Sequence, residues 1–141
     1  MVAKKNYDQL ISNMPHEMRM IQSDLCAFLE SYPEKIEAKN LILVANLPYI
    51  PDKTFEENAP SNVQKWEPKL AFVGGDDGLD LYRKMFSQLQ TYTQKTKSLT
   101  LFLEMMTRQL EILRKEFGEI MEFEEVKTFH FNIRIVKARF R

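Results

Sequence analysis

The chain has 141 residues, of which 44% are hydrophobic and 28% are charged, and its basic and acidic residues are equal in number. This composition is typical of one ordinary soluble domain, and a zero net charge produces no overall field toward nucleic acid or an anionic membrane. No apolar run reaches the length of a membrane span, and no signal-peptide core follows Met1. We therefore expect a cytoplasmic domain without a membrane segment, in which the lone Cys26 is a buried, inert thiol.

The first part of the chain predicts a helix, a short strand and a second helix. Apolar residues at helical spacing predict an amphipathic helix over residues 2–13, which Pro15 ends. Residues 18–23 alternate between apolar and polar side chains and predict a short strand. Asp24 follows that strand, where its carboxylate could cap a helix over residues 25–30.

The most apolar stretch occupies residues 41–46 and is followed at once by Leu47, Pro48 and Tyr49. An aliphatic run without polar alternation predicts a strand that is buried on both faces, as at the centre of a parallel sheet. Pro48 cannot extend the hydrogen-bond ladder. Asn46 is therefore expected at the carboxyl edge of the sheet, which is where open α/β folds place their ligands.

The residues that end this strand suit the transfer of a group onto a planar, weakly nucleophilic nitrogen. The side-chain oxygen of Asn46 and the backbone carbonyl of Leu47, which Pro48 leaves unpaired, could accept two N–H groups of a substrate amide or exocyclic amine. Tyr49 could stack on the plane of that group. Such a site would act by orientation and electrostatics, and no general base is required beside it.

The segment after the candidate site is polar and rich in proline. Residues 52–68 contain Pro60 and Pro68, a pattern that predicts a long loop beside the site. We expect Trp66 to anchor this loop by packing rather than to contact a substrate. Residues 69–73 predict a short strand.

Three aspartates follow this segment, and their spacing lacks the remaining ligands of a calcium loop. Helix capping explains them better, with Asp77 as the N-cap residue and Asp80 in the first turn. The helix that they begin has one face of large apolar side chains, which we expect to be buried: Tyr82, Met85, Phe86, Leu89 and Tyr92. No metal site is expected.

The remaining chain predicts a strand over residues 98–104, a helix over 107–117 and two further strands over 119–126 and 131–135. Alternation of apolar and polar residues in the last two strands suits an antiparallel pair at the less buried side of a sheet. We expect Glu104 and the other glutamates of this region to lie on solvated faces rather than to act as paired catalytic acids.

Three linked segments resemble the HemK-type release-factor glutamine methyltransferases in content, order and spacing. They are the run from Asn46 to Pro51, the run from Trp66 to Pro68 and the run from Gly74 to Arg83. The first is also similar to the Asn-Pro-Pro-Tyr signature of the wider group of amino-methyltransferases. That family usually has Pro where this chain has Leu47, and Asn-Leu-Pro-Tyr is the form found in ribosomal-RNA adenine dimethyltransferases. Adenine therefore stays as an alternative substrate.

The resemblance implies an α/β fold, namely a Rossmann-like class I methyltransferase sheet of strand order 3-2-1-4-5-7-6 with flanking helices and an antiparallel C-terminal strand pair. It implies S-adenosylmethionine as the cofactor and a peptide-chain release factor as the protein substrate. The implied catalytic residues are Asn46, Pro48 and Tyr49, and Leu47 joins them in binding the substrate. Asp24 matches the acidic residue that accepts from the adenine amine of the donor, and Asn46 lies near the donor as well.

The family holds the donor with a Gly-rich turn after its first strand and an acidic residue after its second, and this sequence contains neither. A helical domain that the family carries at its N-terminus is missing too. We therefore expect residues 1–141 to be the C-terminal portion of a methyltransferase domain. The two absent strands would lie between the strands at 18–23 and 41–46. The latter would then have an open apolar edge that seeks a second copy or a companion N-terminal chain.

Three functions remain open at this point. The first is glutamine methylation of a release factor. The second is methylation of adenine in RNA or DNA, for which a basic C-terminal tail offers a small basis: Arg134, Lys137, Arg139 and Arg141. The third is a non-catalytic fragment or partner-binding module.

Overall fold

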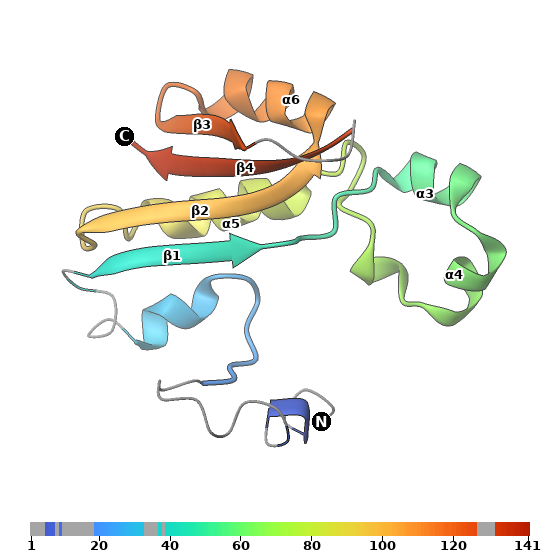
Figure 1. Ribbon diagram of the computed structural model, residues 1–141, viewed down its shortest axis with the longest axis horizontal. Coiled ribbons are helices and arrows are strands. Elements are labelled where there is room, and N and C mark those ends of the chain that lie inside the picture. The colour runs from blue at the N-terminus through green and yellow to red at the C-terminus, as the bar shows by residue number, and fades with distance from the viewer. Residues whose placement is uncertain (1–4, 8, 10–18, 33–36, 38, 127–131) are drawn as a thin grey trace.

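A mixed four-stranded sheet organises the chain in the computed structural model, which describes residues 5–7, 9, 19–32, 37, 39–126 and 132–141. The strands are β1 (Asn40–Ala45), β2 (Ser98–Met106), β3 (Met121–Val126) and β4 (Ile133–Phe140). Their spatial order is β1-β2-β4-β3, with β1 and β2 parallel and the other pairs antiparallel (Figure 1).

This order corresponds to the last four strands, 4-5-7-6, of the expected class I sheet. The predicted mixed α/β fold with an antiparallel C-terminal strand pair is therefore confirmed. Two longer helices flank the sheet, α5 (Asp80–Gln90) and α6 (Thr107–Phe117), and the latter has the bounds that the sequence predicts. The other helical elements between residues 19 and 126 are short: η1 (Ala27–Ser31), α3 (Asp52–Asn58), α4 (Ser61–Trp66) and η2 (Lys69–Ala71).

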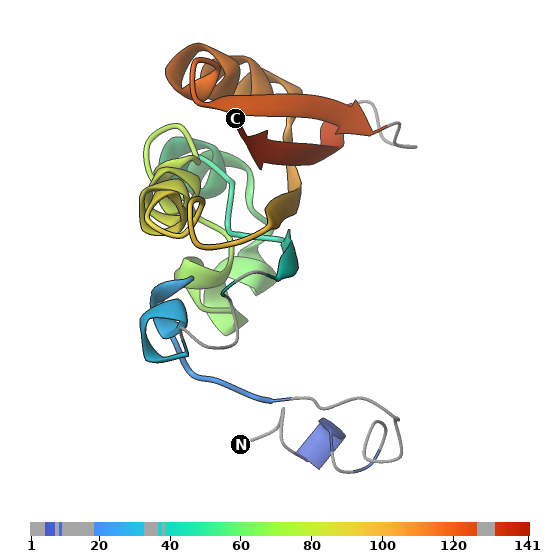
Figure 2. The ribbon, with the colours of Figure 1, turned by 90° about the vertical axis from the view of Figure 1, so that its left-hand side faces the viewer.

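The core lies between one face of the sheet and the helices α5 and α6, which both views place on the same side of the strands (Figure 2). Side chains of β2 alternate between buried and partly exposed, and the buried set is Leu99, Leu101, Leu103 and Met105. The predicted face of the helix after Asp80 is buried as well, which confirms that prediction: Tyr82, Met85, Phe86, Leu89 and Tyr92. Each large side chain of this kind contributes about 1.5–3 kcal/mol by leaving water.

The strand β1 is less buried than its aliphatic sequence predicts. Its side chains alternate, and Ile42 and Val44 are 72% and 79% exposed. Within the described residues β1 pairs only with β2, so it is an edge strand of the sheet. The prediction of burial on both faces is therefore wrong for this chain. The physical reason is that burial of an aliphatic strand depends on neighbours that the strand itself does not encode.

Two predictions for the N-terminal part are also wrong. Residues 19–23 form no regular strand, because no described segment pairs with them. The helix predicted over 25–30 is the 3₁₀-helix η1, and the hydroxyl of Ser23, not the carboxylate of Asp24, accepts the N–H of Phe28 at 2.9 Å. Of the helix predicted over residues 2–13, only residues 5–7 and 9 belong to the described part, and they are helical.

The segment predicted as a long loop contains the helices α3 and α4. Pro51 and Pro60 immediately precede these helices, where a fixed φ favours helix entry and no intrahelical N–H is lost. The ring of Phe55 in α3 stacks on Phe72 with centroids 5.6 Å apart. Trp66 is 76% exposed, so the prediction that it anchors the segment by packing is wrong.

The short strand predicted over residues 69–73 is mostly the 3₁₀-helix η2. Val73 at the end of this segment forms an isolated parallel bridge with Ile50. This bridge nevertheless connects the segment after β1 to the segment before α5. The N–H of Ile50 donates to the carbonyl of Phe72 at 2.8 Å, and the N–H of Gly74 donates to the carbonyl of Ile50 at 3.1 Å.

Candidate functional site

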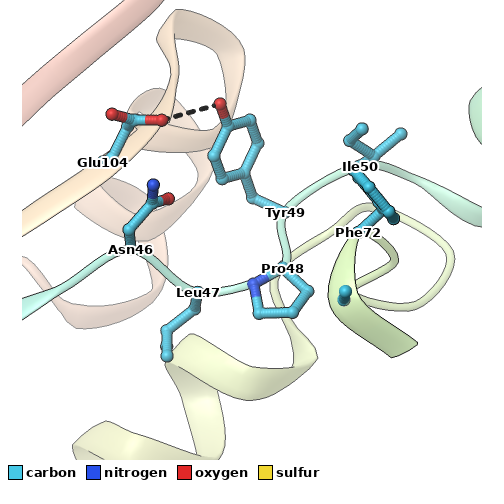
Figure 3. A pocket seen from close by; sticks show the side chains of 8 residues that line it. Asn46, Leu47, Pro48, Tyr49, Ile50, Phe72 and Glu104 are labelled. Carbon is cyan, nitrogen blue, oxygen red and sulfur yellow. Dashed lines mark hydrogen bonds between the residues drawn. The ribbon is translucent and has the colours of Figure 1, made fainter. Parts of the chain in front are cut away.

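The residues that follow β1 surround a small pocket at the carboxyl end of the parallel strand pair (Figure 3). Its volume is about 240 Å³, and its lining residues come from the segment after β1, from the end of η2 and from the end of β2. They are Asn46, Leu47, Pro48, Tyr49, Ile50, Ala71, Phe72 and Glu104. The structure therefore brings the predicted Asn46, Leu47, Pro48 and Tyr49 together around one cavity.

The position of this pocket follows from the register of the sheet. Ala45 of β1 pairs with Leu103 of β2, so Asn46 and Glu104 lie one step further along neighbouring parallel strands. The side chain of Asn46 is exposed and directed toward Glu104 and the ring of Tyr49. Polar groups that follow adjacent parallel strands meet at one edge of the sheet.

Tyr49 is held at its hydroxyl and at its backbone carbonyl. The hydroxyl donates a hydrogen bond of 2.9 Å to a carboxylate oxygen of Glu104, and the carbonyl accepts one of 2.6 Å from the side-chain amide of Gln109. Burial, together with the hydrogen bond and negative charge of Glu104, raises the pKa of Tyr49 to about 12. The tyrosine is therefore neutral at physiological pH, and its ring has a fixed place beside the pocket.

Glu104 is a pocket residue that sequence reasoning missed. We predicted that it lies on a solvated face, but it is half-buried, lines the cavity and accepts the Tyr49 hydroxyl. The hydroxyl of Tyr82 donates to the backbone carbonyl of Glu104, and burial is the main cause of the raised pKa of Tyr82. The sequence signal that points to Glu104 as a pocket residue is its position near the end of the strand that neighbours β1.

Gln109 is a second residue that sequence reasoning missed. It is 3% exposed, and its amide nitrogen donates to the carbonyls of Tyr49 and Asp77 at 2.6 and 2.9 Å. Its side-chain oxygen accepts the N–H of Met106 at 2.9 Å. Gly78 lies beside Tyr49 and Gln109 with a φ of +79°. A Cβ at this position would overlap the carbonyl of Tyr49 and the amide of Gln109.

Asp77 has a structural role at the start of α5. Its carboxylate accepts the N–H of Leu79 at 3.0 Å, and both of its oxygens bind Arg83, at 2.9 and 2.6 Å. The hydrogen bonds from Arg83 are the main cause of the lowered pKa of Asp77. The carboxylate thus caps the turn before α5 rather than the helix itself, which begins at Asp80. Among the described residues, no group of three or more His, Cys, Asp or Glu side chains could hold a metal ion.

Asp24 does not line the pocket around Asn46. Its carboxylate is exposed and pairs with the ammonium group of Lys84 at 2.5 Å. The residues after it line a separate hollow of about 540 Å³ beside β1, which also includes Asn46 and Leu47. Cys26 lies in this hollow; it is 3% exposed, and burial raises its pKa to about 11, as expected of an inert thiol.

Comparison with known proteins finds relatives named release factor glutamine methyltransferase, among them proteins of Bacillus cereus, Bacillus anthracis and Geobacter sulfurreducens. The chain is 35% identical to the Bacillus cereus and Bacillus anthracis proteins over 94 residues, which is 67% of this chain and 30% of each relative. The chain is a relative of the release factor glutamine methyltransferases. It is also 48% identical to the Geobacter sulfurreducens protein over 42 residues, which is 30% of this chain and 14% of that relative.

The matched part of this chain spans about a third of the length of the Bacillus proteins. No family model matches the chain, and no solved structure matches it. In the part of the chain that the structure describes, no helix is long and apolar enough to cross a membrane. The family resemblance drawn from the three sequence segments is confirmed by the names of these relatives.

Proposed function

We propose that this chain is the C-terminal portion of an S-adenosylmethionine-dependent methyltransferase that acts on the side-chain amide of a glutamine in a peptide-chain release factor. The observation that carries the proposal is the pocket around Asn46, Leu47, Pro48 and Tyr49 at the carboxyl end of β1. The relatives named release factor glutamine methyltransferase support the choice of reaction and of substrate.

In this proposal the chain acts by orienting a neutral amide. The side-chain oxygen of Asn46 and the carbonyl of Leu47 accept the two N–H groups of the substrate, so that the nitrogen lone pair is aimed away from them. The ring of Tyr49, fixed at both ends, stacks on the amide plane. Fixed acceptors of this kind cost no reorganisation during the reaction.

S-adenosylmethionine would supply the methyl group as an electrophile. Asn46 and Leu47 line both the substrate pocket and the hollow beside β1, so a donor in that hollow would be next to the substrate. The residues of the hollow fit an aromatic, apolar group, since Leu25, Cys26 and Phe28 form one of its walls. We assign Asp24 and Asn46 to donor binding. In this role Asp24 would have to release Lys84 and accept a hydrogen bond from the adenine amine of the donor instead.

The assignment of residues 1–141 to a C-terminal portion explains the exposed aliphatic face of β1. The curated relatives are about three times as long as the matched part, since it covers 30% of each. Strands that precede this chain in a longer protein, or in a companion chain, would pair with the free edge of β1, and the segments that connect them could cover the face of Ile42 and Val44.

Methylation of adenine is the second candidate, and the presence of Leu47 in place of Pro favours it. The basic tail argues against it, because three of its four cations pair with acidic residues of the neighbouring strand β3. Lys137 binds Glu124 at 2.5 Å, and Arg134 binds Glu125 at 3.0 Å. Paired cations release fewer counterions from nucleic acid than free ones. A non-catalytic, partner-binding fragment is the remaining alternative.

The variant Asn46→Ala tests the proposal in the protein completed by fusion or by a companion chain. Loss of one preorganised acceptor should lower turnover by about a hundredfold or more. Because Asn46 is exposed, the free energy of unfolding should change by less than about 1.5 kcal/mol. Tyr49→Phe should be milder, since the stacking plane is kept.

The assay uses labelled donor with a release-factor protein and with an adenine-containing RNA, and Asn58→Ala in α3 serves as the control. Near-normal turnover of Asn46→Ala on the preferred substrate would exclude the amide-orienting role. Methylation of the RNA alone would select the second candidate function.

A further inference from the structure

The pocket around Asn46 has an unusual charge distribution. Among its lining residues Glu104 is the one charged side chain, and the others are apolar or neutral. Glu104 makes no ion pair with any residue that the structure describes. Among the described residues, a half-buried carboxylate without a cationic partner is thus the one charged group in the lining of a cavity of about 240 Å³, where a nearby charge acts strongly on a ligand.

Only part of this carboxylate is occupied by protein contacts. One oxygen accepts a hydrogen bond of 2.9 Å from the hydroxyl of Tyr49. The Glu104 side chain lies above the side chain of Asn46 (Figure 3). An ionised carboxylate can accept at both oxygens, so acceptor capacity remains for a ligand. It can attract an N–H group and repel an anion.

We infer that Glu104 is a specificity-determining residue, which makes the pocket accept a neutral carboxamide and reject the carboxylate of the same shape. This inference rests on the proposed function, since it takes the pocket around Asn46 as the substrate site. Glutamine and glutamate side chains are nearly equal in size, so shape alone cannot separate them. A fixed negative charge separates them because it favours N–H donors and disfavours a second carboxylate.

The inference also defines a division of labour within the pocket. Asn46 and the Leu47 carbonyl orient the accepted amide, whereas Glu104 decides which group enters. Tyr49 links the two tasks because its hydroxyl fixes the carboxylate. Removing that hydroxyl leaves the negative charge in place, so selectivity should survive Tyr49→Phe and be lost in Glu104→Gln.

The test uses the 141-residue chain itself, because every lining residue of the pocket belongs to it. The probes are N-acetyl-glutamine methylamide and N-acetyl-glutamate methylamide, each titrated at pH 7 while the Asn46 side-chain amide signals are followed by NMR. We expect the wild-type chain to prefer the glutamine probe by about tenfold or more, the effect of one nearby like charge. Glu104→Gln should reduce this preference to about twofold or less, by the same reasoning. Glu111→Gln, an exposed glutamate of α6, is the charge-matched control and should keep the wild-type preference.

Three results would overturn the inference: an unchanged preference in Glu104→Gln, an equal loss in Tyr49→Phe, or no binding of either probe in the tens of millimolar range. Failure of the proposed function gives a different result. If the completed protein transfers no methyl group to a release factor but the Glu104-dependent preference persists, the selectivity stands and the reaction assignment is wrong.

Discussion

The side-chain amide of Gln109 donates a hydrogen bond of 2.6 Å to the backbone carbonyl of Tyr49, which joins the first turn of α6 to the segment after β1. The same nitrogen donates to the carbonyl of Asp77 at 2.9 Å, before the start of α5. Segments that are 60 and 32 residues away in the sequence thus converge on one buried amide. The Gln109 amide thus connects the segment that lines the pocket to the starts of α5 and α6.

We predict that Gln109→Ala lowers the free energy of unfolding by about 2–4 kcal/mol, because it leaves two carbonyls and one N–H without partners and removes buried volume. Chemical denaturation measures this directly. Gln90→Ala, at an exposed position of α5, is the matched control and should change stability by less than about 0.5 kcal/mol. Equal small effects of the two variants would show that the bridge does not stabilise the fold.

The free edge of β1 leads to a prediction about association. Its backbone groups on this edge have no partner among the described residues and lie next to Ile42 and Val44, which are 72% and 79% exposed. The strand β1 contains no charged residue. We therefore expect the purified chain to self-associate with increasing concentration, through pairing of this edge with a second copy. Val44→Lys should abolish association, since a lysine on an edge strand opposes strand pairing.

Sedimentation velocity over a range of concentrations measures this association. Leu70→Lys is the matched control, because Leu70 is also 79% exposed but belongs to η2. A monodisperse wild-type monomer whose β1 amides exchange rapidly with solvent would contradict the prediction, as would equal behaviour of the two lysine variants.

Much of the fold could be predicted from the sequence, because periodicity and breakers act locally. The apolar spacing of α5 and the alternation in β2 directly reflect which face meets the core. The loop prediction for residues 52–68 misses the helices α3 and α4 because it takes Pro60 and Pro68 as signs of a loop. Pro51 and Pro60 stand just before these two helices, where a proline favours helix entry. The positions of Asn46 and Tyr49 followed from Pro48 ending the strand. The place of Glu104 did not, because it depends on the register between β1 and β2.

Donor binding by the isolated chain gives a further prediction. The sequence has four glycines, and the structure gives three of them other tasks: Gly74 lies against Pro48, Gly78 lies against Tyr49, and Gly118 follows α6. Gly75 lies against the carboxylate of Asp80 in the same way, so each glycine already faces another part of this chain rather than a site open to a methionine group. We expect calorimetry to detect no appreciable binding of S-adenosylmethionine to the chain alone, whereas the completed protein should bind it. Micromolar affinity of the 141-residue chain would contradict this expectation.

The raised pKa of Tyr49 leads to a prediction about stability at alkaline pH. Its pKa is about 12 in the folded chain, against an ordinary value of about 10 for an unfolded tyrosine. The folded state therefore holds this proton more tightly, so the resulting stabilisation is complete below about pH 10 and disappears as pH rises to about 12. The stability difference between wild type and Tyr49→Phe should shift against wild type across this interval.

Urea denaturation at closely spaced pH values measures this difference, with Glu104→Gln as the second variant. Because burial and Glu104 together raise this pKa, Glu104→Gln should lower it and move the loss of stability to lower pH. A difference between wild type and Tyr49→Phe that is constant from pH 9 to pH 12 would show that folding does not raise the pKa of Tyr49.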